Sequence, residues 1–138
     1  MPNTKVAVTF ERVYDLMQRR ATQARDSLTE TMEQVSTSAS QGHLLTASTV
    51  ERMFEEHYTV RSWNNVIRTV DEAVQTKSLR TLTLKLQEWA TDATEQLLSP
   101  GRSHSTSLVR TAEMEAEEYG MKTVLRAVSQ FISLATAK

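Results

Sequence analysis

Apolar residues recur along the first third of the chain at alternating steps of four and three residues. This spacing is the a/d seam of a heptad repeat, and only one of its eight positions, Thr31, is polar. No Gly or Pro interrupts the segment, so the pattern predicts one continuous helix over residues 9–36, with Thr9 as its N-cap. We expect the later, shorter helices to pack against this long N-terminal helix. The seam positions are Phe10, Tyr14, Met17, Ala21, Ala24, Leu28, Thr31 and Val35.

A second amphipathic pattern predicts a helix over residues 48–75. Ser48 and Glu51 have the spacing of a capping box at its start. The two leucines just before it, Leu44 and Leu45, are expected to pack on the core. The apolar rhythm slips between residues 57 and 62, so a straight helix and a helix split at that point both remain open.

Two further helices are predicted over residues 78–98 and 106–136. Within the first, residues 79–86 also carry a short alternation of period two, so strand remains an alternative there, although the helical pattern persists over many more residues. Gly120 interrupts the second and costs about 1 kcal/mol relative to Ala, so we expect close packing or a bend at that position. The predicted fold is all-α: an up-and-down bundle of four helices, or five if the second splits, forming one domain over residues 1–138.

Composition narrows the functional classes. Sixteen basic and seventeen acidic side chains leave a net charge of −1, which excludes strong charge-driven attachment of the whole molecule to nucleic acid or membrane. The chain has no cysteine, so disulfides and thiol chemistry are excluded. No secretory signal or membrane-spanning stretch is recognisable, and we therefore expect a soluble, cytoplasmic protein without a membrane partner.

Residue spacing gives little support to catalysis. The histidines His43, His57 and His104 share no spacing that suits a metal site, and Glu113 and Glu117 are more simply read as a solvated helix face. No phosphate-binding loop, dinucleotide-binding turn or nucleophile elbow is present. We therefore expect no catalytic residue, no metal and no cofactor.

The heptad seam instead predicts a protein that acts by helix–helix burial. It is longer than the shorter helices need to cover, and the small residues Ala21 and Ala24 would let a partner helix approach closely. The expected function is that of an adaptor, a chaperone-like partner or a structural subunit, which forms a homo-oligomer or binds another helical protein in coiled-coil fashion. The residues expected to contact the partner are Phe10, Tyr14, Met17, Ala21, Ala24 and Leu28 on the seam, with Arg20 and Arg25 beside it.

Nucleic-acid binding is the alternative function. It would use arginines on the first helix and a helix–turn–helix-like segment over residues 50–69, although that segment lacks a Gly at its turn and carries several carboxylates. The candidate contacts are Arg12, Arg19, Arg61, Asn64, Asn65 and Arg68. Trp63 and Trp89 are expected in or at the edge of the core, and either one, if exposed, would be a good anchor for a partner.

Overall fold

A computed structural model describes residues 8–98 and 108–136, with side chains in the second range from residue 113 onward. The described residues form helices and no strand, which confirms the all-α bundle and settles residues 79–86 as helix. The second predicted helix is split, so there are five helices in the described ranges. These helices are α1 (Phe10–Ser40), α2 (Ala47–Thr69), α3 (Asp71–Thr76), α4 (Leu79–Leu97) and α5 (Leu108–Thr136). The first two residues predicted for the last helix, 106 and 107, lie outside the described ranges.

Side-chain caps explain where three of the helices begin. Thr9 accepts a hydrogen bond from the backbone N–H of Arg12 at 3.2 Å, as predicted. The capping box at Ser48 is wrong, because Thr46 caps α2 by accepting from the N–H of Thr49, also at 3.2 Å. Ser78 caps α4 in the same way, by accepting a hydrogen bond from the backbone N–H of Thr81 at 3.2 Å.

The split in the second helix falls at Val70, not between residues 57 and 62, where α2 runs without interruption. Val70 and Ala73 are fully buried, so the short α3 continues the core contact after the break. Lys77 then takes a left-handed conformation (φ 50°, ψ 33°) and turns the chain into α4. Neither Gly nor Pro marks this corner in the sequence.

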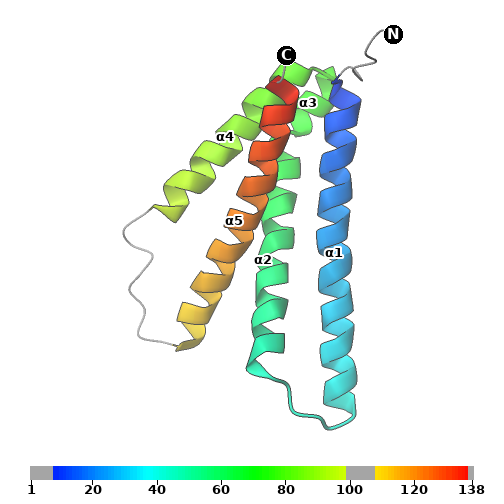
Figure 1. The fold of residues 1–138 in the computed structure, drawn as a ribbon, viewed down its shortest axis with the longest axis vertical. Coiled ribbons are helices and arrows are strands. Elements are labelled where there is room, and N and C mark those ends of the chain that lie inside the picture. Colours follow the sequence, from blue (N-terminus) through cyan, green and yellow to red (C-terminus); the bar gives the residue numbers. More distant parts are fainter. Residues whose placement is uncertain (1–7, 99–107, 137–138) are drawn as a thin grey trace, which may run out of the picture.

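The helices lie side by side in the order α4, α5, α2, α1 (Figure 1). The most extensive contact joins α2 to α5, and α1 lies mainly on α2 while α4 lies mainly on α5. The expectation that the shorter helices pack on α1 is therefore confirmed for α2 but wrong for α4, and the centre of the bundle is the α2–α5 pair. The physical reason is that α2 and α5 are apolar on more than one side and can each cover two neighbours.

Gly120 explains how α2 and α5 come so close. A Cβ atom at this position would lie 2.6 Å from the backbone carbon of Tyr58 and 2.7 Å from the backbone nitrogen of Thr59. The predicted close packing is thus confirmed, because no side chain fits between the two backbones.

The hydrophobic core occupies one half of the bundle. We call the end of the molecule that holds residues 24–57, which include the connection between α1 and α2, and residues 108–118 of α5 the distal half, and the remainder the proximal half (Figure 1). In the described distal half only Thr31 and Ala116 are buried. The largest fully buried apolar side chains are all proximal, namely Met17, Leu82, Leu86, Val13, Val66, Val70, Val124 and Val128.

Candidate functional site

The seam of α1 is covered largely by the chain itself. Phe10, Met17 and Ala21 are buried in the core, and Tyr14 and Ala24 are half-buried against it. This corrects the expectation that these residues contact a partner, because α2, and to a smaller extent α5, already occupies that face of α1. Leu28, the next seam residue, is half-buried and lies outside the core cluster.

The polar seam position, Thr31, has an internal explanation. Its side chain has no exposed surface, and its hydroxyl donates a hydrogen bond of 2.8 Å to Oε2 of Glu56 on α2. The other carboxylate oxygen of Glu56 is held at 2.9 Å by Nε of Arg52. A buried hydroxyl is acceptable here because it has a charged partner.

Arg20 and Arg25, expected beside the seam, are both exposed. Nε of Arg25 lies 3.5 Å from the backbone oxygen of Ala21. Within the described residues neither guanidinium takes part in an ion pair, so both remain free to meet a carboxylate on another molecule.

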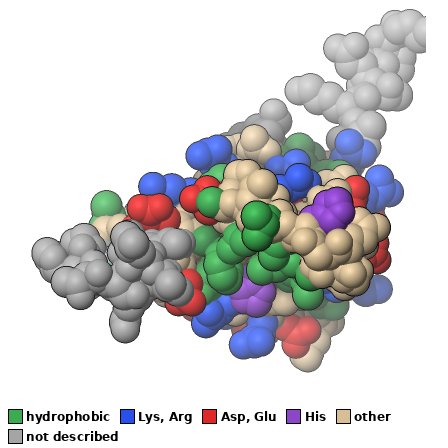
Figure 2. All heavy atoms as spheres, turned by 90° about the horizontal axis from the view of Figure 1, so that it is seen from below, with side chains coloured by type: hydrophobic (Ala, Val, Ile, Leu, Met, Phe, Trp, Pro, Cys, Tyr) green, Lys and Arg blue, Asp and Glu red, His purple; other side chains and the backbone are tan. Residues whose placement is uncertain are grey.

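Apolar side chains are exposed at the distal end instead. Leu44 is 97% exposed, Met32 53% and Leu45 40%. The expectation that Leu44 and Leu45 pack on the core is wrong, because the connection between α1 and α2 holds them beyond the last buried residues. Viewed from this end, hydrophobic side chains form a gathered patch (Figure 2). Apolar side chains of this end of the bundle include exposed Met32, Leu44 and Leu45 and half-buried Val35, Val50 and Phe54, and we call this set of residues the distal surface.

The surroundings of the distal surface are acidic. The distal segments contain ten carboxylate side chains and only three arginines, a balance of −7 in a chain of net charge −1. The remaining segments therefore carry +6. A small pocket of about 80 Å³ between α2 and α5 shows apolar and acidic side chains next to each other. It is lined by Phe54 and Ala116 and by the carboxylates of Glu51, Glu55 and Glu115.

The tryptophans belong to the core. Trp63 is 3% exposed and meets the ring of Phe131 edge-on, with 6.3 Å between the ring centres, and Trp89 is 9% exposed. The prediction that they are core or boundary aromatics is confirmed. Neither one is therefore an exposed anchor for a partner.

The helix–turn–helix interpretation of residues 50–69 is wrong. All of these residues lie in one uninterrupted helix, α2, so no turn separates a recognition helix from a supporting one. On α1, Arg19 pairs with Asp15 at 2.9 Å, whereas Arg12 is exposed.

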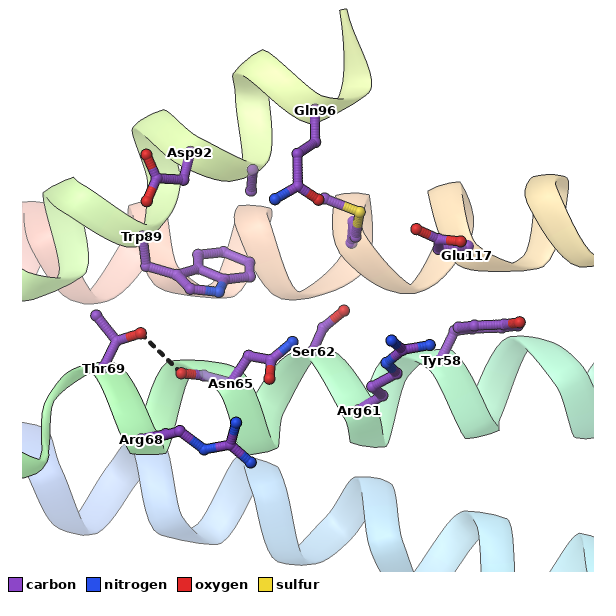
Figure 3. Close-up of a pocket in the computed structure, with 12 residues that line it drawn as sticks. Tyr58, Arg61, Ser62, Asn65, Arg68, Thr69, Trp89, Asp92, Gln96 and Glu117 are labelled. Atoms are coloured by element: carbon purple, nitrogen blue, oxygen red, sulfur yellow. Dashed lines mark hydrogen bonds between the residues drawn. The ribbon is translucent and has the colours of Figure 1, made fainter. Parts of the chain in front are cut away.

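Three of the predicted nucleic-acid contacts, Arg61, Asn65 and Arg68, share one face of α2. They line a cleft of about 350 Å³ between α2, α4 and α5 (Figure 3). Asn64 is exposed and is not among the residues of the cleft. The spacing of Arg61, Asn65 and Arg68, at steps of four and three residues, could be recognised in the sequence. That residues of α4 line the opposite side of the cleft could not.

Among residues 8–98 and the described side chains of α5, no three His, Asp or Glu residues come together as a metal site, and His104 lies outside the described residues.

The pKa of Lys85 is raised, chiefly by a hydrogen bond to Glu72 and by the nearby charge of Glu88. Nζ of Lys85 lies 3.2 Å from Oε2 of Glu72, so this ion pair ties α4 to α3.

Comparison with known proteins gives no guide to function: no protein family, characterised protein or solved structure matches the chain. None of the helices in the described ranges has the length and apolar character that a bilayer span requires.

Proposed function

We propose that this protein is a non-catalytic helical interaction protein, an adaptor, chaperone-like partner or structural subunit, that binds an amphipathic helix of another protein on its distal surface. The observation that carries this proposal is the exposure of Leu44, Met32 and Leu45 at one end of the bundle. Grouped apolar side chains of this kind typically mark an interaction site in a folded protein. Helix-on-helix burial remains the mechanism, but at the end of the α1–α2 pair and not along the seam of α1.

The charge of the distal half argues for a basic partner over a second copy of the chain. Two distal halves brought together would each contribute −7, and like charges oppose such a contact. A helix with lysines or arginines beside its apolar stripe would instead meet carboxylates such as Glu51 and Glu55 while burying its own leucines.

A designed amphipathic peptide tests this proposal directly. The probe is a helix of leucine and lysine with a fluorescent label, and the comparison peptide has glutamine in place of every lysine. We expect the lysine peptide to bind in fluorescence anisotropy titrations and the glutamine peptide to bind at least about tenfold more weakly, because it loses the charge complementarity.

Paired variants locate the contact. The double variant Leu44→Ser and Leu45→Ser should abolish binding without changing the fold, since both side chains are exposed. The matched control is Leu84→Ser on α4, which removes a leucine that is 55% exposed outside the distal half and should leave binding unchanged. Equal loss in both variants, or no binding of the lysine peptide, would contradict the proposal.

Light scattering separates a partner protein from self-association. We expect a monomer at neutral pH. A dimer that dissociates when Leu44→Ser and Leu45→Ser are introduced would show that the distal surface binds a second copy of the chain. That result would overturn the proposal of a basic partner. Co-purifying nucleic acid that salt releases would instead favour the nucleic-acid function.

A further inference from the structure

The cleft between α2, α4 and α5 has the size of a small-molecule site. Its volume is about 350 Å³, at the lower end of the range in which proteins hold small ligands. Residues of α2 form one wall and residues of α4 the opposite wall, and α5 runs between these two helices (Figure 3). All of its lining residues except Glu117 lie in the proximal half, and it shares no residue with the distal surface.

Two buried polar groups face this cleft without a partner. Ser62 is 6% exposed and Trp89 is 9% exposed, and both line the cleft. Within the described residues, neither the Ser62 hydroxyl nor the indole N–H makes a hydrogen bond. In Figure 3 the indole of Trp89 lies between α4 and α2, with its nitrogen on the side of α2. An indole nitrogen only donates, so what completes this site is a hydrogen-bond acceptor.

The cationic side chain of Arg61 lies beside Ser62 in the lining of the cleft (Figure 3). Arg61 adjoins Ser62 in the sequence, and its guanidinium carbon lies 6.0 Å from the ring centre of Tyr58. Arg61 and Arg68 have no ion-pair partner among the described residues. An acceptor that also meets a guanidinium is most favourable when it carries negative charge, as a carboxylate does.

The rest of the lining limits the ligand's charge and shape. Asp92 of α4 and Glu117 of α5 also line the cleft, so a multiply charged anion would meet two carboxylates there as well as the arginines. Ala93 and Met121 add apolar surface. A ligand with one negative charge and an apolar body matches both features.

We propose that this cleft binds a small monocarboxylate with an apolar or aromatic body, whose carboxylate oxygens accept hydrogen bonds from Ser62, Trp89 and Arg61. The site is independent of the distal surface and of the partner proposed for it. Binding would brace α4 against α2, which meet less extensively than α2 and α5 do.

Benzoate is the test ligand, and the indole N–H resonances of the two tryptophans in ¹⁵N–¹H NMR spectra are the readout. Trp89→Phe assigns the resonances. Benzoate should shift the Trp89 resonance to saturation and leave that of Trp63 in place, because Trp63 is not part of the cleft. Benzamide, which has the same shape without the charge, should bind at least about tenfold more weakly, and inorganic phosphate should give no saturable shift.

Variants of the cleft complete the experiment. Arg61→Gln and Ser62→Ala should each weaken benzoate binding about tenfold, whereas Arg126→Gln, which removes an exposed arginine of α5 outside the cleft, should leave it unchanged. The proposal is overturned if benzoate leaves the Trp89 resonance unmoved, which would mean that water alone satisfies the two donors. Equal binding of benzamide, or tighter binding of phosphate, would overturn it as well.

Discussion

Met17 and Met32 lie on the same helix, about four turns apart, in opposite surroundings. Met17 is in the proximal half and has no exposed surface, whereas Met32 is in the distal half and is 53% exposed. The apolar pattern of α1 continues through both halves, yet the hydrophobic core and the side chains packed against it include residues of α1 only as far as Ala24. The contrast teaches that a continuous heptad pattern marks a helix with an apolar face, but not how much of that face its own chain will cover.

The largest difference in stability is expected between the alanine variants of these two methionines. Met17→Ala should lower the free energy of unfolding by about 3 kcal/mol, because it leaves a cavity in a packed core. Met32→Ala should change it by less than about 0.5 kcal/mol, as surface substitutions usually do. Urea unfolding followed by circular dichroism measures both values. Similar losses in the two variants would show that the halves are equally well packed.

Gly120→Ala probes the contact that joins α2 to α5 near the boundary between the halves. The new Cβ would meet the backbone of Tyr58 and Thr59, so the helices must move apart. The expected loss is about 2 kcal/mol from overpacking, even though Ala favours the helix.

Gly42→Ala is the control for that substitution. Nothing lies within 4 Å of its Cβ, and only its positive φ of 73° opposes a side chain, for which we expect a cost of about 1 kcal/mol. Thermal unfolding of the two variants compares the effects. A loss at Gly42 as large as that at Gly120 would contradict the close approach of α2 and α5.

Thr31→Val sharpens the comparison within the distal half, where a polar contact replaces the apolar core. Without the hydroxyl, Glu56 no longer accepts a hydrogen bond from residue 31, while the added methyl group offsets part of the loss. We therefore expect about 1 kcal/mol of destabilisation. The control is Thr29→Val, whose exposed hydroxyl bonds only to the backbone oxygen of Arg25 and should matter less. Chemical denaturation measures the difference. No loss at Thr31 would mean that this contact does not stabilise the distal half.

The smallest effect is expected at Lys85, on the surface of the proximal half. Its pKa is raised in the folded state, so the stabilisation is fully present below the unfolded pKa near 10.5 and is lost as the pH rises through the folded pKa. Lys85→Gln should therefore lower the melting temperature slightly at neutral pH, and the difference from the original protein should vanish at strongly alkaline pH. A difference that stays constant with pH would show that the ion pair with Glu72 contributes nothing.

The sequence was sufficient to predict where the helices lie along the chain, but not which helices pack against each other. Hydroxyl caps such as Thr9, together with the three- and four-residue rhythm, mark helices because both effects are local. Which helix covers which depends on contacts between residues far apart in the chain, such as Gly120 with Tyr58, and no local pattern encodes them. The break at Val70 was not predicted for a related reason, since Val70 is a buried core residue and no Gly or Pro marks the position in the sequence.

The candidate sites could be predicted only in part. The arginine face of α2 was recognisable, because Arg61, Asn65 and Arg68 recur at helical spacing. That Trp89 lies opposite them follows from the placement of α4, which the sequence does not reveal. The exposure of Leu44 could not be predicted for another reason: two leucines ahead of a helix are typical of a staple, and only the fold shows that Leu44 is almost fully exposed.

The dominant partner of α2 begins about 40 residues after α2 ends, and this separation bears on how the protein is made. During synthesis α1 and α2 emerge together, but Trp63 stays without its contact to Phe131 until α5 has left the ribosome. Until α5 has been made, the apolar surface of α2 that α5 covers therefore stays exposed in the nascent chain.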